Sequence, residues 1–465
     1  MALSSPGIGS NLDVNSIVSQ LMQIEQRPLT LLAQKEAVFQ EKISALGSLK
    51  GAISALQTAG AGLVPATGVT ATEKFTSYKT TVTDTAIASA SASSSAVGGT
   101  YSLEVTSLAK AQRLTSGVNP SVGSGIRTMT IETGSVAGGV GSSGVFTSTS
   151  SIAIALDSSV TTLAGVRDAI NAANTGITAT VVTSGSDSYL SLTSNQTGTA
   201  SVMRVTGDIA ALNYEPSTNT GALVQNAGDE AADAALKING ISITGSGNTI
   251  SDAVEGLTIS LKATGTTSVT VARDTSGLSA GVNALVKAYN DFAKVASDLG
   301  RYDATTKQGG PLIGDSTLRS AQNVFRNLLG HVPSELSGTS LQRLSDIGVA
   351  MQKDGTLKVD SAKLDAAISG NFGGVANLVA AYGGAIDTAA GSMVETDGLI
   401  ENRTDGLNAS IKSITQQSES IQQRLILTEE RYRKQFTALD TLIASMTQTS
   451  NYLTQQLANL PGASS

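Results

Sequence analysis

The chain has 465 residues, which is enough for about three domains of ~100 to 200 residues each. Charged residues make up 14% of it and aromatic residues 3%, with no tryptophan, so packing must rely on small and β-branched side chains, which suit sheets and self-association better than a deep ligand pocket. The net charge of −7 argues against nucleic acid or an anionic membrane as a partner, and no apolar run approaches the ~18 residues of a membrane span.

Two consecutive helices are predicted near the N-terminus. Asp13 is a candidate N-cap for a short amphipathic helix whose apolar side carries Val14, Ile17, Val18, Leu21 and Ile24. Pro28 disfavours helical angles at the residue before it, so a break falls here, and it can also start the second helix. The apolar residues of the second helix are spaced by threes and fours: Leu32, Phe39, Ile43, Leu46, Leu49, Ile53 and Leu56.

Residues 76–274 show the alternation of apolar and polar residues that is typical of strands. One helix is predicted among them, at residues 163–170. The simplest pairing joins the strands of residues 235–273 to those before residue 114. This pairing makes residues 117–223 an inserted α+β domain.

Helices resume after Gly277, and Asp354-Gly355 predicts a tight turn between two short strands. The last helix carries a long apolar seam. Alternate steps of four and three from Leu407 to Leu460 give sixteen positions, of which eleven are apolar, and this is the pattern of a coiled coil. A helix of that length, roughly 80 Å at ~1.5 Å per residue, cannot bury its seam alone. The N-terminal helices are its predicted partner.

The terminal helices are therefore predicted to form an antiparallel coiled coil, the leg. Its contacts are expected from Phe39, Ile43, Leu46, Ile53, Ile414, Ile421, Leu425, Tyr432, Leu439 and Leu442. The C-terminal seam is longer than the helix that could cover it, and unburied apolar seams imply partner subunits. The residues expected to make such contacts are Leu12, Ile17, Leu21, Ile24, Met446, Tyr452, Leu453 and Leu457. The alternative is an intramolecular hairpin that only closes one domain.

The predicted fold is multidomain α+β, with an antiparallel coiled-coil or helical leg formed by the N- and C-terminal segments and β-rich head domains inserted between them. Four domains are expected. They are terminal helical or disordered segments at 1–40 and 441–465, a helical leg at 41–75 and 275–440, a β-rich head at 76–116 and 224–274, and an inserted α+β head at 117–223.

No catalytic, cofactor or metal site can be assembled from the sequence. His331 is the only histidine, which excludes a multi-histidine metal site, and the absence of cysteine excludes disulfides and thiolate chemistry. The glycine-rich residues 134–144 lack the Gly-Lys-Ser/Thr that completes a phosphate loop. Arg431, Arg433 and Lys434 are more simply a solvated helix face than a basic binding patch. We therefore expect no enzyme activity and no cofactor.

The N-terminus has no lysine or arginine before Arg27, so it lacks the charged start of a secretory signal peptide. By that test the chain is cytosolic. The test covers the general secretory route only, because a dedicated export machine would leave no such mark.

Several segments resemble those of one protein family, in the same order along the chain. They are residues 7–14 (GIGSNLDV), 99–105 (GTYSLEV), 247–250 (GNTI), 354–357 (DGTL) and 431–440 (RYRKQFTALD). Residues 161–193 resemble a module that is shared with flagellins. Over nearly its whole length the chain thus resembles the flagellar filament-capping proteins, also called hook-associated protein 2 or FliD. The insert at residues 134–150 shows the least resemblance to this family.

The resemblance implies a secreted structural protein at the distal tip of the bacterial flagellum. It would leave a cytosolic export chaperone, pass unfolded through the flagellar type III system without a cleaved signal peptide, and assemble outside the cell as a homo-oligomeric ring, expected to be a pentamer. Its partners would be flagellin, whose ordered insertion and filament elongation it promotes, and the hook–filament junction protein. Neither nucleic acid nor a membrane is expected as a partner.

Two other functions stay open. The first is an adhesin whose head binds host glycans or proteins. The sequence of such a head would contain a cluster of exposed aromatic residues, and this head has few aromatic residues. The second is another flagellar axial protein, either flagellin or the hook–filament junction protein, which shares helical ends. The segments at 247–250 and 354–357 favour the cap.

Overall fold

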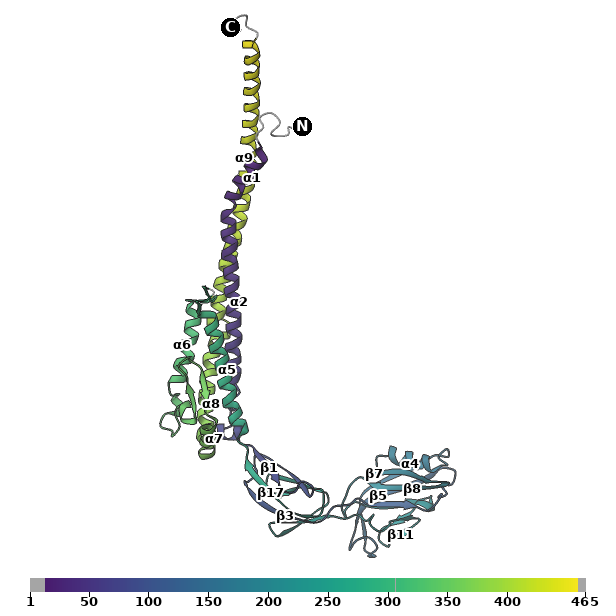
Figure 1. Cartoon of the computed structure of the whole chain (residues 1–465). Coiled ribbons are helices and arrows are strands. Elements are labelled where there is room, and N and C mark those ends of the chain that lie inside the picture. Colours follow the sequence, from purple (N-terminus) through teal and green to yellow (C-terminus); the bar gives the residue numbers. More distant parts are fainter. Residues whose placement is uncertain (1–12, 306, 459–465) are drawn as a thin grey trace. The chain divides into compact units, whose positions relative to one another are not determined.

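The computed structural model describes residues 13–305 and 307–458, and the chain divides into two compact units (Figure 1). Unit 1 combines both ends of the chain, Met1–Lys74 and Leu278–Ser465, and unit 2 is the middle, Phe75–Gly277. Unit 1 is mainly helical and unit 2 is mainly strand, as the predicted multidomain α+β fold requires. Within the described ranges, no helix is long and apolar enough to cross a membrane.

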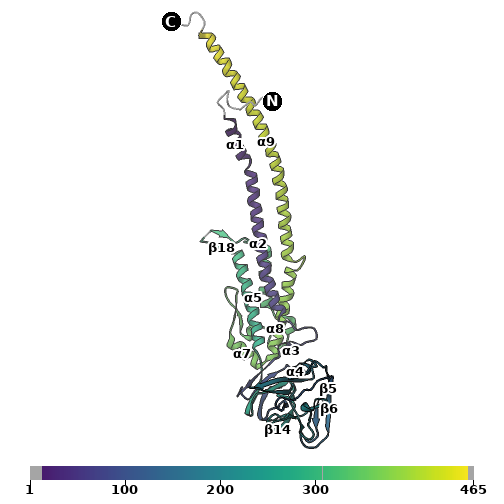
Figure 2. The same ribbon diagram turned by 90° about the vertical axis from the view of Figure 1, so that its right-hand side faces the viewer.

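Unit 1 is organised by two long helices, one from each end of the chain. α2 (Arg27–Ala61) and α9 (Leu399–Ala458) lie side by side and run antiparallel (Figures 1 and 2). An ion pair of 3.8 Å between Lys50 Nζ and Glu401 Oε2 joins the middle of α2 to the start of α9. The predicted antiparallel leg is therefore present.

A short helix, α1 (Val14–Glu25), leads into α2 through a single turn residue, Gln26. Pro28 lies in the first turn of α2, where its missing N–H costs no hydrogen bond. The Asp13 carboxylate accepts a hydrogen bond of 3.0 Å from the Ser16 amide and so caps α1. The predicted N-cap and helix break are both observed.

The other helices complete unit 1. They are α3 (Ala71–Phe75), α5 (Ser276–Gly300), α6 (Ser316–Gly330), α7 (Ser361–Gly370) and α8 (Phe372–Val394), with the 3-10 turns η2 (Ser334–Leu336) and η3 (Leu344–Ile347). Two small hairpins pair β18 (Tyr302–Asp303) with β19 (Gln308–Gly309) and β20 (Val349–Met351) with β21 (Leu357–Val359). The second hairpin turns at Gly355, whose φ of 84° explains the Asp-Gly signal.

A buried carboxylate ties α6 to α9. Asp315 accepts hydrogen bonds from the Thr317 amide at 2.9 Å and from Arg403 Nη2 on α9 at 3.0 Å, and only 3% of its side chain is exposed. Burial by itself would raise the pKa of Asp315, but the hydrogen bonds from Thr317 and Arg403 outweigh it and hold the pKa below its ordinary value. A charged carboxylate therefore caps α6 and fixes its position on the leg.

Unit 2 contains two pairs of antiparallel sheets. The first pair has a five-stranded sheet in the order β1 (Tyr78–Val82), β17 (Gly265–Arg273), β3 (Gly99–Ser107), β13 (Ala234–Ile238) and β14 (Ile241–Gly245), and a three-stranded sheet in the order β15 (Thr249–Val254), β16 (Leu257–Leu261) and β2 (Ala88–Ala92). Val105 pairs with Leu236 on one side and with Gly265 on the other, so the strands of residues 235–273 do join those before residue 114. Leu103, Leu236 and Ile259 lie in the shared core.

The second pair of sheets encloses its own core. One sheet has the order β11 (Thr220–Gly221), β10 (Tyr214–Glu215), β9 (Val202–Gly207), β5 (Arg127–Val136) and β6 (Phe146–Leu156); the other has the order β12 (Leu223–Val224), β4 (Arg113–Ser116), β8 (Asp187–Ser194) and β7 (Ile177–Ser184). The helix α4 (Leu163–Ala172) and the 3-10 turn η1 (Ala210–Leu212) complete it. Val166 and Ile170 of α4 pack with Leu190 and Leu192 in this core.

The predicted limits of the insertion, 117 and 223, are corrected by the strand pairing. These limits place β4 in the β-rich head, but Leu114 pairs with Leu192 of β8, and Val224 of β12 pairs with Thr115 of β4. The insertion thus starts at Arg113 and includes Val224. A two-residue strand such as β12 has no periodicity from which its sheet could be predicted.

Candidate assembly interface

The first helix of the chain docks on the last. Val14, Val18 and Met22 of α1 are buried against Leu425 of α9. Polar contacts fix the register: Arg433 Nη1 donates to Asn15 Oδ1 at 2.9 Å, and the Tyr432 hydroxyl lies 3.2 Å from the Glu25 carboxylate. Phe436, three residues beyond Arg433, also packs against this cluster, so the contact of α1 with α9 extends at least to Phe436.

The predicted leg seam is only partly buried. Leu46, Ile53, Ile414 and Leu425 are buried, whereas Phe39, Ile43, Ile421 and Tyr432 are half-buried. Leu439 and Leu442 are 41% and 56% exposed, so the expectation that they pack within the leg is wrong for this single chain. Both lie beyond Phe436, which still packs against the cluster that α1 forms with Leu425. The heptad pattern identified their apolar face but not the length of the opposing helix.

The residues predicted for contacts with other subunits fall into two groups. In α1, Ile17 and Leu21 are half-buried and Ile24 is exposed, while Leu12 lies outside the described residues. In α9, Met446, Tyr452, Leu453 and Leu457 are all exposed, by 54 to 64%. The structure therefore brings the first group to the edge of the α1–α9 contact and leaves the second group without a cover among the described residues.

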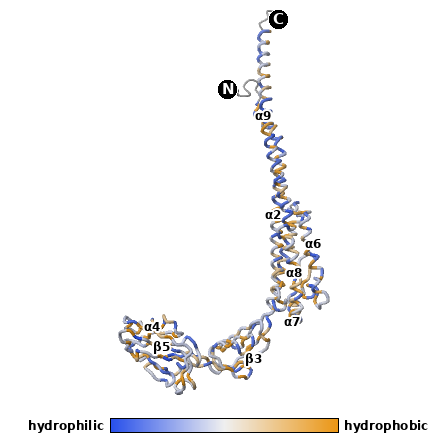
Figure 3. Tube along the Cα trace, turned by 180° about the vertical axis from the view of Figure 1, so that it is seen from behind, coloured by the Kyte–Doolittle hydropathy of each residue, from blue (hydrophilic) through white to orange (hydrophobic). Residues whose placement is uncertain are grey.

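The exposed positions of α9 form one continuous row. Leu439, Leu442, Met446, Leu453 and Leu457 follow one another by steps of three, four or seven, so they continue the face that α1 covers nearer the middle of the helix. The row spans about 27 Å at ~1.5 Å per residue. In Figure 3 this end of α9 shows hydrophobic positions among hydrophilic ones. We call these five residues the distal seam.

Sequence reasoning missed two features of the surface. Met22, which the predicted apolar side of α1 did not include, joins the predicted Val14 and Val18 in the buried contact with α9. Ile426 and Leu427 are 61% and 66% exposed outside the heptad row, and Leu31 and Val38 of α2 are exposed as well. The sequence did contain a signal for this exposed surface. Residues 426 and 427 are adjacent apolar residues, and two neighbouring helix residues cannot both face the same partner.

The interface offers apolar helix surface and little chemistry. The described ranges contain no group of three or more His, Cys, Asp or Glu residues that could hold a metal ion. Arg433, which lies six residues before the start of the distal seam, is held by Glu429 at 2.8 Å and by Asn15. Such a surface can bind another amphipathic helix along its length.

Comparison with known proteins agrees with the whole architecture. The family models described as flagellar hook-associated protein 2 N-terminus and C-terminus match residues 10–112 and 231–448, and the flagellin hook IN motif matches residues 138–196 within the insertion. The flagellin-like module that the sequence indicated is thus confirmed.

Relatives align along almost the entire chain. The flagellar hook-associated protein 2 of Escherichia coli K12 is 33% identical over 98% of both chains, and the A-type flagellar hook-associated protein 2 of Pseudomonas aeruginosa is 31% identical over 98% of this chain and 97% of its own. The crystal structure of the flagellar cap protein FliD D1-D2-D3 domains from Escherichia coli matches with a TM-score of 0.59 and 31% identity, over 78% of this chain and 99% of that one. With fold, segment order and length in agreement, the chain belongs to the flagellar hook-associated protein 2 family.

Proposed function

We propose that this chain caps the distal end of the flagellar filament, where it forms a ring of identical copies and promotes the ordered insertion of flagellin. Its relatives carry the name of hook-associated or cap protein, and their likeness to this chain extends through both terminal helices. The observation that carries the proposal is the distal seam, an uncovered apolar row at the end of a 60-residue helix.

The distal seam favours assembly on energetic grounds. Burying a leucine or methionine side chain stabilises by ~1.5 to 3 kcal/mol relative to leaving it exposed. Five such side chains at heptad spacing therefore supply a strong drive toward a partner helix, which the single chain does not offer along the described residues. The distal seam would then be buried against flagellin at the filament end.

The partners follow from this role. The copies of a closed ring contact one another head to tail, so each copy uses two different surfaces. We propose that the ring has five copies. Flagellin would contact the distal seam, the hook–filament junction protein would precede flagellin beneath the cap, and a cytosolic chaperone would hold the chain before export. The route would be the flagellar type III system to the extracellular filament tip. The role needs no covalent step, so we propose no enzyme activity.

The adhesin is the weaker candidate. The large, strongly exposed apolar side chains of unit 2 are valines and isoleucines, such as Ile126 and Val145, and not the aromatic residues that stack on sugars. No feature of unit 2 therefore favours a glycan partner over the cap function.

A double substitution in the distal seam tests the proposal. Leu453→Ser with Leu457→Ser should barely change the melting of the isolated protein, because both side chains are already exposed. In cells the same variant should release unpolymerised flagellin into the medium. The matched control is Gln448→Ser with Gln455→Ser, on the opposite side of α9, which should leave filaments intact. Filaments of normal length with an exported, stable seam variant would contradict the proposal.

A further inference from the structure

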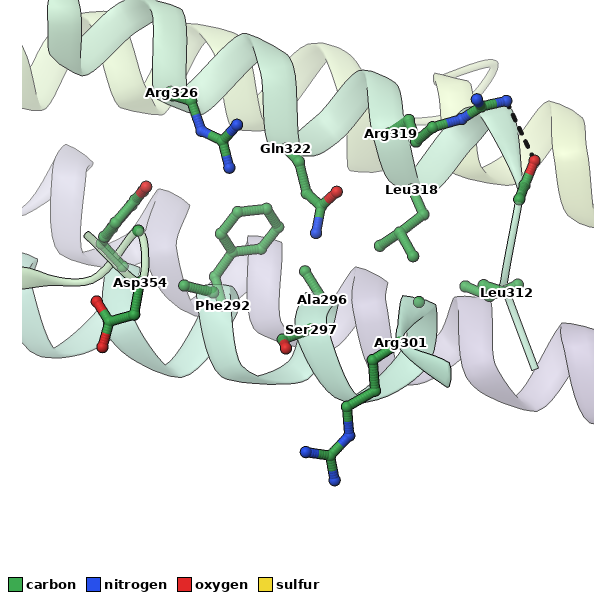
Figure 4. Close-up of a pocket in the computed structure, with 15 residues that line it drawn as sticks. Phe292, Ala296, Ser297, Arg301, Leu312, Leu318, Arg319, Gln322, Arg326 and Asp354 are labelled. Carbon is green, nitrogen blue, oxygen red and sulfur yellow. Dashed lines mark hydrogen bonds between the residues drawn. The ribbon is translucent and has the colours of Figure 1, made fainter. Parts of the chain in front are cut away.

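A cavity of about 380 Å³ lies between α5 and α6 of unit 1, and none of its lining residues belongs to the distal seam. Short side chains on α5 create it. Ala293, Ala296, Ser297 and Gly300 are spaced by threes and fours, so they share one face of α5 and leave space beneath α6. Figure 4 shows this gap between the two helices.

The opposite wall, on α6, carries long polar side chains. Arg319, Gln322 and Arg326 are spaced by three and four, which places them on one face of that helix. In Figure 4, Gln322 and Arg326 point from α6 toward Phe292 and Ala296 of α5. Long donors thus face a wall of small residues across an open space.

Among the described residues, no carboxylate pairs with the two arginines of this wall. Arg326 makes no hydrogen bond or ion pair with any residue that the structure describes, although its Nη2 lies near the turn at Gly355. Arg319 donates only to the Gly314 carbonyl oxygen, at 3.2 Å. Guanidinium groups with free donors attract carboxylates, which they can bind in a bidentate manner.

The single carboxylate among the lining residues does not neutralise them. Asp354 accepts hydrogen bonds from the Thr356 hydroxyl at 2.7 Å and from the Thr356 amide at 3.0 Å. These two bonds lower the pKa of Asp354, so it stays charged while it holds the β20–β21 turn. The free donors of Arg326 therefore remain available for an anion from outside.

The floor of the cavity is apolar. Phe292 is buried and packs edge-on against Phe325 with ring centroids 4.9 Å apart, and Leu312 and Leu318 are buried beside it. We propose that the cavity binds a carboxylate carried on an apolar stem, with the stem on Phe292 and the carboxylate at Arg326. The source is either a free organic acid or the acidic side chain of a peptide.

A ligand-observed NMR titration of the full-length protein with phenylbutyrate tests this site. We expect saturable binding with a Kd on the order of 1 mM or tighter. The neutral isostere phenylbutyramide should bind at least about tenfold more weakly, because it cannot form charge-assisted hydrogen bonds. A capped leucine–glutamate–leucine peptide and its glutamine counterpart form the second arm. Binding of the glutamate peptide assigns the site to a protein segment, and binding of phenylbutyrate alone assigns it to a free acid.

Substitutions locate the binding. Arg326→Gln should abolish the preference for the acid, and Ser297→Leu should reduce the affinity for both probes by filling the cavity from an exposed position. Arg424→Gln, an exposed arginine on α9, is the matched control and should change nothing. Equal binding of acid and amide, no saturable binding of either, or a preference that survives in the Arg326→Gln variant would overturn the proposal.

Discussion

Gly60 and Gly383 bring the backbones of α2 and α8 into direct contact. A Cβ atom built on Gly60 would lie 2.7 Å from the carbonyl oxygen of Gly383, and one built on Gly383 would lie 2.8 Å from the carbonyl oxygen of Gly60. Neither position can hold a larger side chain unless the two helices separate, because the clash is with backbone. The pair therefore sets how closely the N-terminal helix approaches the centre of unit 1.

Gly60→Ala should accordingly destabilise the protein, although alanine is the better helix former. Forcing the helices apart costs ~1 to 3 kcal/mol, which exceeds the ~0.5 to 1 kcal/mol that glycine-to-alanine exchange contributes within a helix. Urea unfolding measures the difference. Gly47→Ala and Gly51→Ala in the same helix are matched controls with nothing within 4 Å of the added Cβ, and they should raise the free energy of unfolding. A Gly60→Ala protein as stable as these controls would refute the close contact.

Docking of α1 on α9 should depend on Val18. This side chain is 1% exposed and lies in the small cluster that joins the two helices. Val18→Ala should therefore increase amide hydrogen exchange throughout α1, because a short helix is marginal without its tertiary contact. Ile24→Ala, at an exposed position of the same helix, is the control and should leave the exchange unchanged. Equal exchange in the two variants would show that α1 is not held by this cluster.

Asp315 should make stability depend on pH. Its folded pKa is lowered, so the stabilisation is fully present above the unfolded value of about 3.9 and is lost as the pH falls through the lower folded pKa. Asp315→Asn keeps a capping side chain but loses the charged pairing with Arg403. We expect ~1 to 3 kcal/mol lower free energy of unfolding at pH 7, and a smaller difference below about pH 4.

Denaturant unfolding at several pH values measures this difference. Asp360→Asn, at the exposed N-cap of α7, is the matched control because it removes a charge and retains a cap. If the Asp315 and Asp360 variants show the same pH profile, the buried pairing does not stabilise the fold in the way described.

The insertion should be removable. Its two ends meet where Gln112 Nε2 lies 2.5 Å from Gln225 Oε1, so a short glycine–serine bridge can replace residues 113–224. The remaining strands of unit 2 keep their own core around Leu103 and Leu236. We expect cooperative thermal unfolding of the shortened protein, measured by circular dichroism. A molten or insoluble product would show that the two cores depend on each other.

Much of this architecture could be predicted, because helices with a heptad pattern and strands with strict alternation carry their own periodicity. The apolar seam that starts at Leu407 predicted both the last helix and its antiparallel packing against the N-terminal helices. Other features depend on distances that periodicity does not contain. Among the described residues, Leu439 and Leu442 have no cover beyond Phe436, the last residue of α9 in the α1 cluster, and the contact of Gly60 with Gly383 joins residues more than 300 positions apart. The cavity beside Arg326 likewise arises from two helices that meet only in the fold.

The unbroken course of α9 restricts how the leg can change in length. Each residue added to an α-helix turns everything beyond it by about 100°, so one extra residue after Arg433 would carry the distal seam to another side of the helix. Seven extra residues would return it to nearly the same side, displaced by about 10 Å. Variation in the reach of this helix is therefore expected in steps of whole heptads, each of which keeps the same side chains aimed at the same neighbour.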